Sequence, residues 1–201
     1  TPIYDAGGPD PAGIEQAAEI LSTSERGLLV IGDRVGEEDA VQETVHIAEL
    51  LGLPVYQAPG GNVGFPTNHP QFMGSLALRR SEHREVIRRA DAMLAVGADI
   101  FSDLFYFTDI QLQEETKLIH IDPRPGMVGR SEPTDIGILA SPKLALPALG
   151  KSIESRLDAS RLAAIDDRRS AVHDARSAER SAYESAVAER WEDRKSTRLN
   201  S

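Results

Sequence analysis

The sequence predicts an α/β protein with a Rossmann-like, doubly wound and mainly parallel sheet of five to six strands, followed by a long C-terminal helical extension. Short apolar runs recur along the first 150 residues, and helix-period segments separate several of them, as βαβ units require. All 12 prolines and all 16 glycines lie at or before Gly150, whereas the remainder is rich in Ala, Arg and Glu. That remainder favours an unbroken helix, so we place a domain boundary near Gly150.

The predicted strands are expected to be buried on both faces of the sheet, because their apolar residues are mostly continuous rather than alternating. In chain order, they are expected over residues 27–31, 54–58, 92–96, 117–121 and 135–139. Amphipathic helices are expected over 14–21, 40–51 and 79–90, where apolar residues recur with helical spacing. This alternation of strands and helices favours right-handed crossovers within one sheet.

The chain divides into four predicted segments. Residues 1–11 are expected to be an interdomain linker, 12–150 the α/β domain, 151–194 a helical connector, and 195–201 (KSTRLNS) a non-native tail. We therefore expect the natural chain to continue past residue 194. The apolar positions of the connector are too sparse for a helix of this length to be stable by itself, so we expect it to need a further surface.

The composition excludes several classes of protein. Cysteine is absent, which excludes disulfides, thiolate metal sites and a cysteine nucleophile, and fits a reducing cytoplasm. The sequence shows neither a run of eighteen apolar residues nor a signal-peptide pattern. A net charge of −10 opposes binding to nucleic acid or to anionic membranes. We expect a cytoplasmic protein with no nucleic-acid or membrane partner.

Polar and glycine residues follow three of the predicted strands. Gly32 and Asp33 lie where a dinucleotide fold brings its backbone close to a pyrophosphate, and Gly97, Asp99 and Asp122 follow the third and fourth strands. The two later aspartates are placed to hold a ribose hydroxyl. The sequence has neither GxGxxG nor a P-loop motif here, however, and aspartates before turns are ordinary. A weak nucleotide site and a set of plain turns both stay open.

The connection over residues 60–71 (GGNVGFPTNHPQ) is long enough to be functional. His69 within it is placed to orient a ligand or to titrate near neutral pH, although a lone histidine more often packs a loop. The five histidines show no metal-binding spacing with carboxylate support, and the sequence has no GxSxG motif. We predict no metal site and no catalytic residue in this chain, with His69 as the one weak candidate for lying near an active site.

Five stretches occur in an order and spacing that resemble one known family. They are GLLVIGDRVGEEDA, AELLGLPVY, GFPTNHPQFMG, RADAMLAVGAD and KLIHIDPRPGMVGR, and they cover roughly residues 10–150. Together they resemble the central domain of thiamine-diphosphate-dependent enzymes, the family of acetolactate synthase, benzoylformate decarboxylase and pyruvate oxidase. FPTNHPQFMG looks most like the benzoylformate decarboxylase branch, and residues 152–194 resemble the connector to the next domain.

This resemblance implies a three-domain parent enzyme. In the family, the N-terminal domain supplies a glutamate that activates the cofactor, and the C-terminal domain binds its diphosphate through Mg²⁺ with a GDG…N motif. This chain has no GDG. We therefore expect thiamine diphosphate and Mg²⁺ to bind outside it, and the chain alone to be an inactive piece of a 2-oxo-acid decarboxylase or carboligase. The missing N- and C-terminal domains are its implied partners, in a homodimer or homotetramer.

Binding of FAD is disfavoured by the same comparison. The flavin branch has an arginine directly after the VGA-type turn and a GMHG-like run after the HP loop, where this chain has Asp99 and the GSLA run of residues 74–77. Two alternative functions stay open: a stand-alone module that binds NAD, FAD or ADP, and an interaction protein that uses its long helix.

Overall fold

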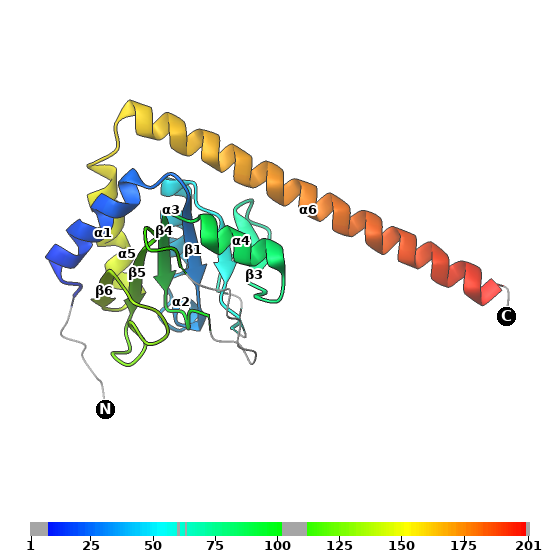
Figure 1. The fold of residues 1–201 in the computed structure, drawn as a ribbon, viewed down its shortest axis with the longest axis horizontal. Helices are drawn as coiled ribbons and strands as arrows, with labels where there is room; N and C mark the ends of the chain where they lie inside the picture. The colour runs from blue at the N-terminus through cyan, green and yellow to red at the C-terminus, as the bar shows by residue number, and fades with distance from the viewer. Residues whose placement is uncertain (1–7, 60, 63, 102–111, 200–201) are drawn as a thin grey trace.

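Six parallel strands form one sheet in the order β3-β2-β1-β4-β5-β6 in the computed structural model, which describes residues 8–59, 61–62, 64–101 and 112–199 (Figure 1). The strands are β1 (Gly27–Ile31), β2 (Val55–Gln57), β3 (Phe72–Ser75), β4 (Ala92–Val96), β5 (Lys117–Asp122) and β6 (Ile136–Leu139). The predicted doubly wound parallel sheet is confirmed. The edge strand β3 was not predicted, because it is short, partly exposed and contains Gly74 at a φ of 84°.

Both faces of the sheet are covered, which explains its continuous apolar strands. The helices are α1 (Pro11–Thr23), α2 (Asp33–Glu37), α3 (Val41–Leu51), α4 (Ser81–Arg89), α5 (Pro142–Glu154) and α6 (Ala159–Leu199). Helices α1, α3 and α5 pack with Leu29 and Ile31 of β1, whereas Leu28 and Val30 face a second cluster that includes Ile87 of α4. Alternate residues of one strand therefore serve two separate cores.

Helix α5 lies across the predicted domain boundary. It continues through Gly150 and buries Leu149 and Ile153 against the sheet layer. This helix was not predicted because it contains two prolines, which usually indicate a turn or the end of a helix. Pro142 occupies the first turn, where proline is tolerated, and Pro147 lies inside the helix. The layer that covers the sheet thus ends at Glu154 rather than at position 150. The division into domains stays a prediction, and most of the predicted linker 1–11 lies outside the described residues.

The predicted C-terminal extension is confirmed as helix α6. Its first half runs along the domain as far as the ion pair between Arg80 and Glu179 (3.6 Å), and its second half extends beyond the sheet (Figure 1). Its first turns are anchored. Ile165 is 3% exposed, and the Arg161 guanidinium donates to the carbonyl oxygens of Ser22 (2.8 Å) and Ser24 (3.0 Å) at the end of α1. Within the described residues, no helix combines the length and the apolar character needed to cross a membrane.

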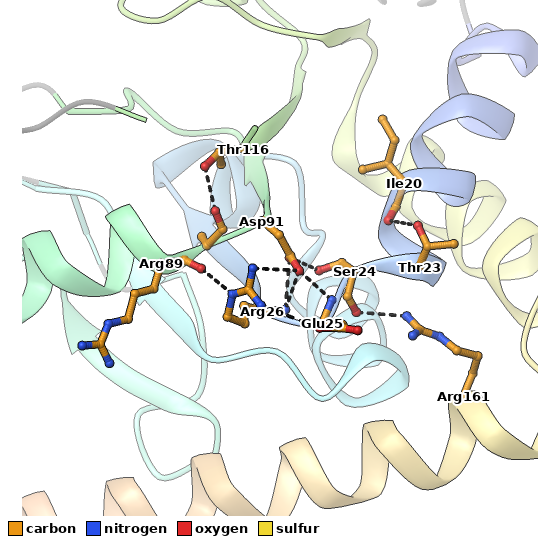
Figure 2. Close-up of polar contacts among 10 residues, drawn as sticks. Ile20, Thr23, Ser24, Glu25, Arg26, Arg89, Asp91, Thr116 and Arg161 are labelled. Atoms are coloured by element: carbon orange, nitrogen blue, oxygen red, sulfur yellow. Dashed lines mark hydrogen bonds and ion pairs between the residues drawn. The ribbon is translucent and has the colours of Figure 1, made fainter. Parts of the chain in front are cut away.

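Asp91 ties the start of β4 to the turn between α1 and β1 (Figure 2). Its carboxylate accepts hydrogen bonds from the Ser24 hydroxyl (2.6 Å) and from the backbone N–H groups of Glu25 (2.8 Å) and Arg26 (3.0 Å). Burial opposes the charge on Asp91, but these hydrogen bonds outweigh burial and hold its pKa below the usual 3.8.

Replacement of Asp91 by Asn should lower the free energy of unfolding at pH 7 by about 1–2 kcal/mol, because an ionised acceptor of several hydrogen bonds is lost. A folded-state pKa below the unfolded value stabilises the fold above the unfolded pKa, and this stabilisation disappears as the pH falls through the folded pKa. Urea unfolding from pH 7 to pH 3 should therefore show the difference shrinking below about pH 4. The exposed Asp167, changed to Asn, is the control. A difference that is constant over this range would contradict the assignment.

Candidate functional site

The carboxyl ends of β1 and β4 form the switch point of the sheet. The chain passes from β1 outward to β2 and from β4 in the opposite direction to β5. Open α/β sheets bind ligands at this position. Here it is formed by the turns that contain Gly32, after β1, and Gly97, after β4.

The two glycine turns at the switch point pack directly against each other. An ideal Cβ placed on Gly32 would lie 2.1 Å from the Gly97 carbonyl oxygen, and one on Gly97 would lie 2.7 Å from the Arg34 Cβ. The Gly32 N–H donates to the Val96 carbonyl (3.0 Å), and the Arg34 N–H donates to the Gly97 carbonyl (3.3 Å). The N–H groups of Gly32 and Arg34, which in a dinucleotide fold are placed to bind a phosphate, therefore donate to protein carbonyls here.

Arg34 lies beside these turns with its guanidinium buried. Its Nε donates to Oδ2 of Asp122 at 2.6 Å, and its Nη2 donates to Oδ1 of Asp99 at 3.2 Å. Asp122 is fully buried, and its second oxygen accepts the backbone N–H of Arg124 (2.9 Å). A buried carboxylate requires such a counter-ion, because an unpaired charge in the interior is costly.

His120 lies next to Asp122 and lines a small cavity. Its side chain is 3% exposed, and its Nε2 lies 3.9 Å from Oδ2 of Asp122, with no hydrogen-bond partner among the described residues. Burial lowers the pKa of His120, although Asp122 acts in the opposite direction, so the ring is neutral at pH 7. The cavity of about 90 Å³, which Asp99, Met127 and Arg130 also line, has room for a few water molecules but not for a nucleotide.

The structure brings together four of the five residues predicted for a nucleotide site: Gly32, Gly97, Asp99 and Asp122. The carboxylate of the fifth, Asp33, instead accepts the backbone N–H of Asn62, in the loop after β2. Whether these residues hold a nucleotide stays a prediction.

His69 lies at the other end of the sheet, because it precedes β3, whereas the other candidates follow their strands. Its Nε2 contacts Oε1 of Glu49 (3.2 Å), its Nδ1 accepts the backbone N–H of Gln71 (3.2 Å), and its ring packs edge-on against Phe65. Both ring nitrogens thus have protein partners. Its predicted place near an active site stays a prediction that involves parts outside this chain.

Arg34 had no predicted role, although it lies within one of the five matched stretches. The sequence did contain a pattern that indicates this ion pair. It has an arginine in the turn after β1 and aspartates at the ends of two other strands, and parallel strands bring these opposite charges to one edge of the sheet. What the sequence does not give is the direction of the side chain, which depends on the contact between the two glycine turns.

The donor set of the described residues does not fit a magnesium–diphosphate site. Within residues 8–59, 61–62, 64–101 and 112–199, His, Asp and Glu form no group of three able to hold a metal ion. The full sequence also has no GDG motif.

Comparisons with known proteins agree with the fold. Residues 14–149 match the family model described as thiamine pyrophosphate enzyme, central domain. A probable acetolactate synthase large subunit of Methanocaldococcus jannaschii is 28% identical over 141 residues, 68% of this chain and 23% of that protein. A probable sulfoacetaldehyde acetyltransferase of Rhizobium meliloti is 32% identical over 177 residues, 86% of this chain and 29% of that protein.

The fold also agrees with a solved structure. Benzoylformate decarboxylase from Polynucleobacter necessarius superposes with a TM-score of 0.64 at 24% identity, over 76% of this chain and 30% of that one, which confirms the α/β fold. The chain spans about a quarter of the length of the curated relatives it matches.

Proposed function

Because this chain belongs to the family of thiamine pyrophosphate enzyme central domains, we propose that it is the structural and subunit-packing domain of a thiamine-diphosphate- and magnesium-dependent 2-oxo-acid decarboxylase or carboligase, and that it is not catalytic alone. The observation that carries the proposal is the match of residues 14–149 to the central-domain family model, together with relatives of which the aligned part of this chain covers only 23–29%. We propose that the other domains of the enzyme hold the cofactor, since the aligned part of this chain covers only 23% of the length of the acetolactate synthase relative.

Helix α6 supports the proposed packing role. Tyr183, Val187 and Trp191 are spaced by four residues, which places them along one face, and they are 70%, 48% and 60% exposed. We propose that another domain of the same enzyme covers this face, in a dimer or tetramer. A nucleotide-binding module is the alternative. The grouping of Asp99 and Asp122 at the switch point favours it, but the contacts of both carboxylates with Arg34 oppose it.

Calorimetric titration of the purified chain with thiamine diphosphate and Mg²⁺ should give no saturable heat, and the chain should not consume 2-oxo acids. The genomic sequence downstream should encode a GDG motif followed by Asn. Tight cofactor binding by the chain, or a downstream region without that motif, would contradict the proposal. Trp191 is the only tryptophan, so its fluorescence also reports whether α6 is covered. In the isolated chain its emission should be that of an exposed indole, and an emission at shorter wavelength would contradict an uncovered α6 face.

A further inference from the structure

We propose that the Arg34 side chain is an intramolecular occupant of the switch point, standing where doubly wound sheets hold a dinucleotide, and that this chain therefore binds no dinucleotide there. The inference goes beyond the proposed function and does not depend on it, since it rests on the geometry of Arg34, Asp99, Asp122 and the two glycine turns. It assigns Arg34 a role as a permanent counter-ion within the fold.

The strand order β3-β2-β1-β4-β5-β6 is the order that binds dinucleotides between β1 and β4. Such binding requires free backbone N–H groups after β1 and a glycine that lets the pyrophosphate come close. In this chain the N–H groups of Gly32 and Arg34 donate to the carbonyls of Val96 and Gly97. The close approach that Gly32 permits is taken by the Gly97 carbonyl, 2.1 Å from an ideal Cβ.

The charges at the switch point also oppose a pyrophosphate. Asp122 is fully buried, and the side chain of Asp99 is 43% exposed, so two carboxylates lie around one guanidinium. Arg34 uses its Nε on Asp122 (2.6 Å) and its Nη2 on Asp99 (3.2 Å). If Arg34 turned toward a phosphate, Asp122 would be left buried without its partner, and the phosphate would face both carboxylates.

The first test is calorimetric titration of the wild-type chain with NAD, FAD and ADP separately, each to about 1 mM, the weak end of specific affinity. No saturable heat is expected for any of the three. Saturable binding with a Kd below about 1 mM would overturn the proposal. This outcome is distinct from failure of the proposed function, which concerns thiamine diphosphate, magnesium and the flanking sequence.

The second test asks whether a free guanidinium can take the place of the side chain. Arg34→Ala leaves a space between two carboxylates, so methylguanidinium should raise the Tm of this variant saturably, by about 3 °C at five times its Kd. Methylammonium should raise it less, because a point charge cannot form the same forked contacts. Arg180→Ala, which removes an exposed arginine of α6, should show no saturable rise. Absence of a rise in Arg34→Ala would overturn the proposal.

If Arg34→Ala is unfolded without ligand, methylguanidinium should restore its native circular dichroism, and failure to do so counts against the proposal.

Arg34→Lys provides a variant that keeps the positive charge. Its ammonium cannot reproduce the forked contacts with Asp122 and Asp99, so its Tm should lie below that of the wild type. If the Tm equals that of the wild type, the two contacts of the guanidinium with Asp122 and Asp99 do not hold Arg34 in the site as proposed.

Discussion

Replacement of Arg34 by methionine is expected to lower the free energy of unfolding by about 3–5 kcal/mol, because Asp122 would remain buried without its counter-ion. The Arg34 Nε lies 2.6 Å from the Asp122 carboxylate, which is fully buried. Urea unfolding at pH 7 measures the loss. Arg180→Met, at an exposed position that pairs with Glu184 within α6, should change stability by less than about 0.5 kcal/mol.

The double variant Arg34→Met/Asp122→Leu separates a counter-ion role from simple packing. Replacing both members of a buried ion pair with apolar residues is often neutral, whereas removing one member is costly. The double variant should therefore be more stable than Arg34→Met alone. The coupling energy between the two positions in the free energy of unfolding should be about 1–3 kcal/mol. Losses that simply add would show that Arg34 does not act through Asp122.

A methyl group added at the switch point should have the second large effect. Gly32→Ala and Gly97→Ala should each lower the free energy of unfolding by about 3 kcal/mol, the upper range for overpacking. At Gly32 the new Cβ would overlap backbone atoms of Gly97, which cannot move aside easily. At Gly97 it would meet Arg34, and the residue also has a φ of 55°, which L side chains rarely adopt.

Gly36→Ala is the matched control for these two variants. Gly36 lies in α2, only four residues after Gly32, but a Cβ there would meet nothing within 4 Å. Alanine at this position should be neutral or should stabilise the fold by up to about 1 kcal/mol. Thermal unfolding of the three variants side by side tests the packing. Equal effects at Gly32 and Gly36 would contradict the close contact between the two turns.

The central strands were predictable because a strand that is buried on both faces appears in the sequence as a continuous run of apolar residues. β1 and β4 coincide with the apolar runs of the sequence, whose residues are all buried. The elements that escaped prediction carry weak or misleading local signals. β3 contains Gly74 at positive φ, α2 has only five residues, and α5 contains Pro147. Packing against the sheet stabilises these elements despite their poor intrinsic propensity.

The candidate site was predictable only in outline. Because the carboxyl ends of parallel strands meet at one edge, Asp99 and Asp122 were expected to lie near Gly32. The role of Arg34 depends on a side-chain direction set by tertiary contacts, which local patterns do not contain.

Side-chain NMR of the arginine Nε–H groups tests most directly whether Arg34 fills the switch point. A ¹⁵N-labelled wild-type chain transferred to deuterated buffer should keep a slowly exchanging Nε–H signal that is absent from Arg34→Lys and does not move when NAD, FAD or ADP is added. If the Arg34 signal exchanges as fast as that of the exposed Arg180, or shifts saturably with a nucleotide, the guanidinium is not locked between Asp99 and Asp122 and the account is wrong.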